Sequence, residues 1–323
     1  MMRKMRNMIP AILVVVLFFG CAGEGLQEVD RYQTRAAVNN RLYHTFDAVL
    51  AELNQLKAEH PSLVHLYSLG RSVEKRPIPL VRMDFSNGAD ASRYLFVAGT
   101  HGDEAAGVEA LLHAMQVLLR MDEAARGELM KKGVQAWFVP VHNPDGYIAN
   151  ERENGRGVDL NRNFPFGYET QKIEPETAAM MSLINSVDFS ASVFFHSAND
   201  EKYENVVRVP FELDRGRTPM RAEEQGRVQR LAHIIGTAGD RLKPAVKYHS
   251  SREMVDAGGI ASDWCMSAFV LDEQKKLVHK ECRNPHPSVT VELCYPKQPM
   301  RAERLQQEKD EASAIVWGVM RNF

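Results

Sequence analysis

The chain has 323 residues, of which 44% are hydrophobic and 25% charged, and its formal charge is −2. A chain of this length and hydrophobic content can bury a large core as one α/β domain, and no linker or internal repeat divides it in two. No block of basic residues suited to nucleic acid is present, so a nucleic-acid-binding function is excluded from the hypotheses.

The N-terminal residues have the pattern of an export signal. Arg3, Lys4 and Arg6 precede an apolar run over residues 9–20 that is shorter than the roughly 20 residues of a membrane span. The run ends at Cys21 in "FFGC", which is similar to a bacterial lipoprotein signal. We therefore expect an exported protein of the periplasm or cell envelope, anchored by a lipid on Cys21, with ordinary secretion as the alternative.

The sequence is accordingly divided into residues 1–20 as the signal, 21–40 as a polar tether and 41–323 as a single domain. Loss of the three cations of the signal changes the formal charge from −2 to −5. Cys265, Cys282 and Cys294 remain after Cys21. In an oxidising compartment one disulfide is expected, with Cys282 and Cys294 as the favoured pair, although all three thiols reduced is the alternative.

The first elements of the domain are a helix and a hairpin. "FDAVLAELNQLKAEHP" has apolar residues at helical spacing and ends at Pro61. The following "LVHLYSLGRSVEKRPIPLVRMDF" predicts two strands that are joined by a turn around Gly70.

Strands then alternate with helices. "RYLFVAGT" predicts a buried strand, and the apolar positions after it have helical spacing: Val108, Leu111, Leu112, Met115, Leu118 and Leu119. Further strands are predicted over residues 135–141, 191–196 and 288–293. This alternation indicates a mostly parallel sheet with both faces covered.

Three candidate metal ligands follow or end these predicted strands. His101 and Glu104 lie between the strand and the helix of "GTHGDEAAG", and His196 ends the strand "ASVFFH". A His-x-x-Glu spacing alone is weak, but ligands collect at the carboxyl ends of parallel strands, and two His with one Glu is a known ligand set for catalytic zinc. His113 and His142 are instead interpreted as structural residues, on a helix and in a loop.

Several ordered motifs resemble the zinc metallocarboxypeptidases, the relatives of carboxypeptidase A. "THGDE", "NPDGY", "RENGRGVDLNRNFP", "FFHS" and "VTVELCYPKQP" occur in the order and approximate spacing of that family. "DLNRNFP" and "TVEL" are closest to the carboxypeptidase N/E branch and to bacterial relatives. The resemblance covers residues 41–323 as one catalytic domain. It implies a three-layer α/β/α fold with a twisted, mostly parallel mixed sheet.

The resemblance also assigns a metal centre. It implies one Zn²⁺ ion per chain, bound by His101, Glu104 and His196, with Asp159 as the carboxylate that accepts a hydrogen bond from a ligand imidazole. Glu292, in the apolar strand "SVTVEL", corresponds to the general base that takes a proton from the zinc-bound water. Burying an unpaired carboxylate in an apolar strand costs free energy, and a catalytic role would explain why Glu292 is kept there.

The same resemblance assigns substrate contacts to "RENGRGVDLNRNF". Asn161 and Arg162 correspond to the residues that bind the free C-terminal carboxylate, and a guanidinium matches a carboxylate through two hydrogen bonds. Arg152 corresponds to the arginine that polarises the scissile carbonyl and stabilises the oxyanion, with Arg156 as the alternative.

The sequence departs from the family at one substrate-binding position. Family members carry a tyrosine four residues before a glycine pair, whereas counting back from Gly258 and Gly259 gives Met254. Tyr248 lies six residues earlier. Because that tyrosine assists binding more than proton transfer, the departure affects specificity before hydrolysis.

The predicted function is hydrolysis of the C-terminal peptide bond of a peptide. Three alternatives remain open: trimming of peptidoglycan stem peptides, a catalytically inactive peptide-binding module, and zinc amidase chemistry on a small acylated amino acid. For the predicted function and for the stem-peptide alternative, the expected partner is a peptide or stem peptide with a free C-terminal carboxylate.

Overall fold

The structure is a computed structural model that describes residues 42–86, 90–165, 172–197, 206–208, 222–242, 261–266, 269–271, 277–279, 286–293 and 302–323. The predicted signal and tether, Cys21, Cys282, Cys294, Met254 and Tyr248 lie outside these residues. Cys265 is buried. Among the described helices, none has the length and hydropathy needed to cross a membrane.

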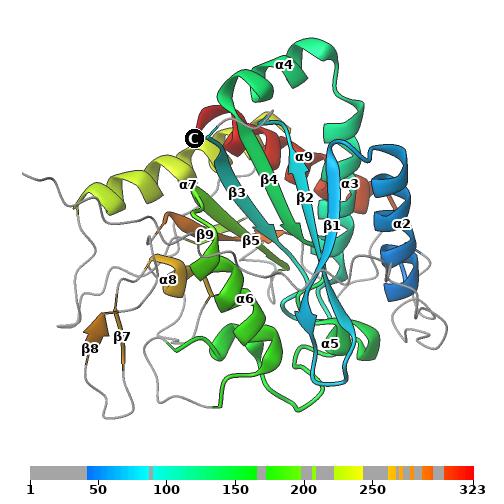
Figure 1. The fold of residues 1–323 in the computed structure, drawn as a ribbon, viewed down its shortest axis with the longest axis vertical. Helices are drawn as coiled ribbons and strands as arrows, with labels where there is room; N and C mark the ends of the chain where they lie inside the picture. Colours follow the sequence, from blue (N-terminus) through cyan, green and yellow to red (C-terminus); the bar gives the residue numbers. More distant parts are fainter. Residues whose placement is uncertain are drawn as a thin grey trace, which may run out of the picture.

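Helices and strands alternate along most of the chain (Figure 1). The helices are α2 (Phe46–Glu59), α3 (Ala105–Arg120), α4 (Glu123–Lys132), α5 (Pro144–Ala149), α6 (Pro175–Ser186), α7 (Ala222–Leu242), α8 (Ala261–Met266) and α9 (Ala302–Asn322), with a 3₁₀ turn η1 (Leu160–Arg162). The strands are β1 (Val64–Arg71), β2 (Pro77–Asp84), β3 (Ser92–Val97), β4 (Val134–Val139), β5 (Ala191–Ser197), β6 (Val206–Arg208), β7 (Phe269–Leu271), β8 (Leu277–His279) and β9 (Ser288–Leu293).

Seven of these strands form one mixed sheet in the order β1-β2-β4-β3-β5-β9-β6. The central strands β4, β3, β5 and β9 are mutually parallel, while β2 and β6 pair antiparallel with their neighbours. Since β1 is antiparallel to β2, it runs with the central strands. The mostly parallel mixed sheet expected from the sequence is confirmed. The short strands β7 and β8 pair separately.

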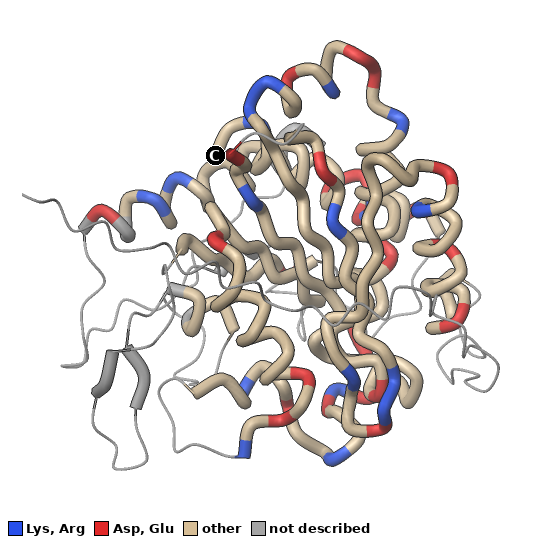
Figure 2. Tube along the Cα trace, viewed as in Figure 1, with Lys and Arg blue, Asp and Glu red and all other residues tan. Residues whose placement is uncertain are grey.

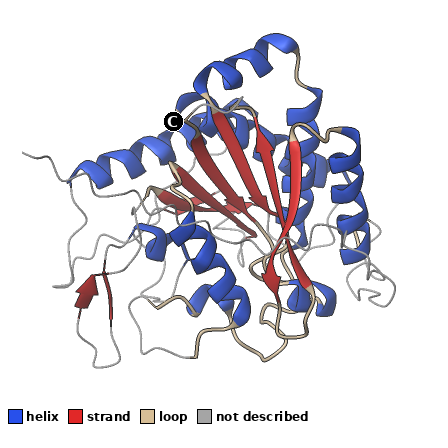
Figure 3. Cartoon of the chain, viewed as in Figure 1, coloured by secondary structure: helices blue, strands red, loops and turns tan. Residues whose placement is uncertain are grey.

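Helices cover both faces of the sheet, which gives the expected three layers (Figure 3). On one face α2, α3, α7 and α9 pack over alternate strand residues such as Phe96, Phe138 and Phe195. On the other face α6 and α8 pack over the intervening residues, among them Leu95 and Phe194. Charged residues lie mainly on the helices and peripheral loops (Figure 2). Both faces of the sheet therefore carry apolar side chains that pack against helices.

The hairpin of β1 and β2 differs from the sequence prediction in the place of its turn. Gly70 lies inside β1, at a register shift between Ser68 and Gly70. A Cβ at Gly70 would come within 2.9 Å of the Ala179 Cβ of α6, so glycine is needed there for close packing. The turn itself lies beyond β1, where Lys75 has a φ of 69°.

The chain reverses its direction across the sheet at β3. From β3 it passes through α3 and α4 to β4 on one side, and from β4 through α5 and α6 to β5 on the other side. Ligands in open α/β sheets bind outside the carboxyl ends of strands at such a switch point. Here that place lies between β3 and β5, next to β9.

Candidate metal centre

The local structure at the end of β3 directs Glu104 into the protein. Glu104 is the residue that precedes α3, where a short polar side chain usually caps the helix. Its carboxylate makes no such cap. Instead, Glu104 Oε1 lies 2.7 Å from His101 Nδ1, and Glu104 Oε2 lies 2.9 Å from His196 Nδ1 and accepts a hydrogen bond from Ser197 N.

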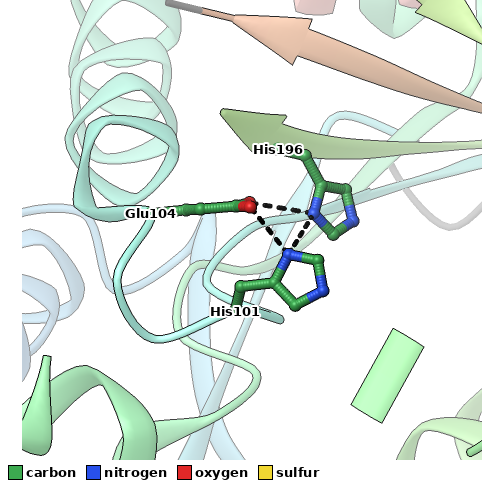
Figure 4. Close-up of side chains that lie close together, drawn as sticks. All are labelled: His101, Glu104 and His196. Carbon is green, nitrogen blue, oxygen red and sulfur yellow. Dashed lines mark hydrogen bonds and ion pairs between the residues drawn. The ribbon is translucent and has the colours of Figure 1, made fainter. Parts of the chain in front are cut away.

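His101, Glu104 and His196 thus come together from two elements that are far apart in sequence (Figure 4). The two Nδ1 atoms lie 3.1 Å apart, and all three side chains are buried. One zinc ion with ligand bonds of about 2.0–2.2 Å would hold its ligand atoms about 3.3 Å from one another. The observed separations are close to this value, so the three residues fit one zinc ion.

The electrostatics of this cluster also favour a cation. Burial acts to lower the pKa of His101, but the charge of Glu104 and hydrogen bonds with Asp159 and Glu104 outweigh it and raise the pKa to about 9. Burial acts to raise the pKa of Glu104, but the two imidazoles hold it well below its usual range. The carboxylate charge that attracts a proton to His101 equally attracts a metal cation.

Asp159 connects the cluster to Arg152. One carboxylate oxygen of Asp159 lies 3.2 Å from His101 Nε2 and also accepts a hydrogen bond from Asn161 N. The other accepts from Nε of Arg152 at 3.0 Å, and Arg152 Nη1 lies 3.1 Å from His101 Nδ1. Although burial acts to raise the pKa of Asp159, its bonds and the nearby cations hold it far below its usual range. Asp159 therefore fixes the His101 ring while capping η1.

The two candidate arginines for the oxyanion role lie in different surroundings. The Arg152 side chain is 34% exposed beside the cluster, and its Nη1 lies 3.8 Å from Glu104 Oε1. The Arg156 guanidinium instead forms an ion pair with Glu174. The geometry favours Arg152 for a contact with a substrate at the cluster.

Glu292 occupies the strand next to His196. The two residues are direct partners in the parallel pairing of β5 with β9, so their side chains share one face of the sheet. Glu292 is 6% exposed. The structure therefore places a buried carboxylate beside the third candidate ligand.

Asn161 and Arg162 lie in η1, which directly follows Asp159. The side-chain oxygen of Asn161 accepts a hydrogen bond from Ala261 N of α8, so its NH₂ group is the part suited to a carboxylate. Arg162 Nη1 donates to the main-chain oxygen of Asn161. Met254, the remaining predicted substrate contact, lies outside the described residues.

The two histidines interpreted as structural do not join the cluster. His142 is fully buried, its Nε2 lies 3.1 Å from the main-chain oxygen of Glu176, and burial lowers its pKa to about 4. His113 pairs with Asp310 of α9.

A buried polar network behind the site was not predicted from the sequence. Asp145, in "NPDGY", accepts hydrogen bonds from Ser72 Oγ, Glu74 N and Arg76 Nη1. Glu176, in "EPETAAM", accepts one from Val73 N. Part of the sequence signal was present, since "NPDGY" resembled a family motif, but it indicated no partner for any of these side chains.

Comparison with known proteins identifies the family. Residues 49–271 match the family described as zinc carboxypeptidase. The chain belongs to the zinc carboxypeptidase family. The predicted resemblance is thereby confirmed, although Glu292 lies beyond the matched residues.

Individual relatives of this zinc carboxypeptidase chain are similar over part of their length. It is 32% identical to carboxypeptidase D of Drosophila melanogaster over 61% of this chain and 16% of the relative. It is 31% identical to mouse carboxypeptidase M, over 48% of this chain and 38% of the relative. The human carboxypeptidase N catalytic chain is 28% identical, over 51% and 46%. The chain thus spans less than half of these relatives.

Solved structures share the fold. Carboxypeptidase A from Helicoverpa armigera superposes with a TM-score of 0.68 at 22% identity, covering 85% of this chain and 72% of that chain. A metallocarboxypeptidase from Burkholderia cenocepacia gives 0.64 at 18% identity, covering 86% and 69%. The carboxypeptidase A-like α/β fold of this chain is therefore shown.

Proposed function

We propose that this protein is a zinc-dependent carboxypeptidase that hydrolyses the C-terminal peptide bond of peptides. The observation that carries the proposal is the convergence of His101, Glu104 and His196, with ligand atoms within 4.8 Å of one another, inside a chain of the zinc carboxypeptidase family. These residues would hold one Zn²⁺. The bound ion would lower the pKa of a water molecule and polarise the scissile carbonyl.

The remaining side chains supply the other parts of the reaction. Glu292, beside His196, would take a proton from the attacking water and deliver it to the leaving amine. Arg152 would donate hydrogen bonds to the oxyanion as it develops. Arg162 and the NH₂ group of Asn161 would bind the free carboxylate of the substrate, which selects a chain end.

The proposed function predicts activity that depends on both zinc and a free C-terminus. Purified protein loaded with zinc is incubated with matched peptides that end in a carboxylate or an amide, and released amino acids are measured. Cleavage of the carboxylate peptides alone supports the proposal. Stoichiometric zinc without cleavage of any free C-terminus contradicts the proposal and favours the catalytically inactive peptide-binding module. Cleavage of purified muropeptides alone favours the stem-peptide alternative.

We also propose export of the chain with a lipid on Cys21. The support is the sequence pattern of the N-terminal segment, which lies outside the described residues. The mass of the protein purified from the expressing bacterium tests this proposal. A mature form that begins at residue 21 with a mass increment of lipid size supports it, and a full-length chain that retains Met1 contradicts it.

A further inference from the structure

The segment that carries Arg152 is a closed turn whose base lies at the metal centre. Arg152 and Asp159 face each other across this base, with Arg152 Nη2 2.9 Å from Asp159 Oδ2. At the tip, Asn154 N donates to Val158 O, and Asn154 Oδ1 accepts from Arg156 N and Val158 N. These bonds hold the turn closed both at Asn154 and at Arg152.

The tip is anchored through the side-chain amide of Asn154. Its Nδ2 donates to Glu174 Oε2 at 3.1 Å and to Glu176 Oε2 at 3.3 Å, and Asn154 is only 4% exposed. The neighbouring pair of Arg156 and Glu174 has a guanidinium that is 46% exposed, so solvent screens it and it contributes little. The buried amide is thus the main connection between the turn and α6.

Glu176 joins this amide to the rigid body of the protein. Its Oε1 accepts a hydrogen bond from Val73 N in the turn after β1, and its main-chain oxygen lies 3.1 Å from His142 Nε2. Glu176 is fully buried in the first turn of α6. Each carboxylate oxygen therefore has a different donor, and a carboxylate fits this place better than an amide.

We propose that Glu176 is a positioning residue that acts through Asn154 to set the place of the Arg152 guanidinium relative to His101, Glu104 and His196. The inference rests on the proposed function for the role of Arg152 in turnover. Glu176 itself touches neither the substrate nor the metal ligands. Its effect on the reaction is entirely an effect on the geometry of Arg152.

The substitution Glu176→Gln tests this inference. Glutamine keeps the shape but presents an NH₂ group either to Val73 N–H or to the Asn154 amide, so one hydrogen bond is lost. We expect kcat to fall about 10- to 100-fold, the range of a displacement of up to about 1 Å, with KM and zinc content unchanged. Glu128→Gln, which alters an exposed ion pair with Arg321, is the matched control and should leave kcat unchanged.

A double-mutant cycle separates positioning from general loss of structure. If Glu176 acts through Arg152, then Glu176→Gln causes no further fall in kcat when Arg152 is already alanine. An equal fall in both backgrounds overturns the inference. If Glu176→Gln does not fold, Asn154→Ser is measured in the same cycle, because it removes the donor and leaves the bond between Glu176 and Val73 intact.

A spectroscopic measurement keeps the inference separate from the proposed function. The Nε–H group of Arg152 donates to Asp159, so its NMR resonance reports on the position of the guanidinium without any turnover. We expect Glu176→Gln to shift this resonance and Glu128→Gln to leave it in place. An unchanged resonance in Glu176→Gln overturns the inference, whereas a shifted resonance in a protein that cleaves no peptide contradicts the proposed function alone.

Discussion

Glu292 lies between Val291 and Leu293 in β9, and all three residues are buried. A carboxylate in such a strand is costly unless its surroundings stabilise the charge. Its place opposite His196 gives a functional reason for that cost. At the scale of single residues, the site can therefore be tested by substitutions that preserve shape and remove one chemical property.

The substitution Glu292→Gln removes the proposed general base and preserves the volume of the side chain. We expect kcat to fall about 10²- to 10⁴-fold, while zinc content and peptide affinity remain unchanged. Steady-state kinetics, metal analysis and calorimetric peptide binding measure the three quantities. Unchanged turnover would remove Glu292 from the proposed mechanism.

The substitution Arg162→Ala removes the proposed carboxylate clamp. Because a hydrogen bond to a charged group is worth about 1.5–3 kcal/mol, kcat/KM for a free C-terminus should fall about 10- to 150-fold. Arg156→Ala, at the ion pair with Glu174, is the control and should retain activity. If Arg162→Ala leaves kcat/KM for a free C-terminus unchanged, the residue does not recognise the carboxylate.

The sequence predicted the residues of this site unequally. His101 and Glu104 are close in sequence, and their spacing was visible without a fold. His196 is 95 residues from His101, so connecting them needed the expected parallel sheet, and the resemblance to a family then assigned both to one ion. The contact of Asn154 with Glu176 depends on how a loop folds against α6, and no local pattern in the sequence contains that information.

At the scale of elements, the loop that carries His101 and Glu104 packs backbone to backbone against helix α5. A Cβ at Gly102 would lie 1.9 Å from the carbonyl carbon of Gly146, and a Cβ at Gly146 would lie 2.4 Å from Glu153 O. The backbones at Gly102, Gly146 and Glu153 are therefore in close contact, and the two glycines leave the space for it. Periodicity predicted the helices and strands around them, whereas Gly70 was assigned to a turn because its packing against α6 is a tertiary contact.

The substitution Gly102→Ala should disturb this packing. Neither neighbouring backbone can move without displacing the other, so we expect a loss of at least about 2 kcal/mol in the free energy of unfolding, together with weaker zinc binding. Gly127→Ala is the control, because a Cβ at Gly127 would meet nothing within 4 Å. Gly127 lies in helix α4, where alanine should increase the free energy of unfolding by up to about 1 kcal/mol. Urea unfolding would contradict this account if both variants behaved alike.

A second element-scale contact joins the start of α2 to α3. Glu109 of α3 is buried and accepts hydrogen bonds from His44 N and Nδ1. The Glu109 hydrogen bond is the main reason that the pKa of His44 is raised above its ordinary value of 6.5. Burial acts to raise the pKa of Glu109, but its bonds with His44 lower it below the ordinary 4.5.

These shifts predict how the contact depends on pH. The raised pKa of His44 contributes stability that is complete below pH 6.5 and is lost as pH rises through the folded-state pKa. The lowered pKa of Glu109 contributes stability that is complete above pH 4.5 and is lost as pH falls through its folded-state pKa. The difference in unfolding free energy between wild type and Glu109→Gln should therefore be largest between pH 4.5 and 6.5 and should shrink above that range. A difference that grows steadily up to pH 9 would contradict this assignment.

At the scale of the whole molecule, the site exists only when the sheet has formed. His101 and Glu104 follow β3, His196 ends β5 and Glu292 lies in β9, and these three strands are neighbours. The alternation of strands and helices predicted that their carboxyl ends would meet. The order of the strands was not visible in the sequence, because it depends on which side of β3 each crossover returns to.

The most direct test of the account is the position of zinc in crystals of the metal-loaded protein, located by anomalous X-ray scattering at the zinc absorption edge. We expect one peak per chain, about 2.0–2.2 Å from one nitrogen each of His101 and His196 and from the Glu104 carboxylate. A peak at another place, or imidazoles of His101 and His196 that point into separate regions, would contradict it.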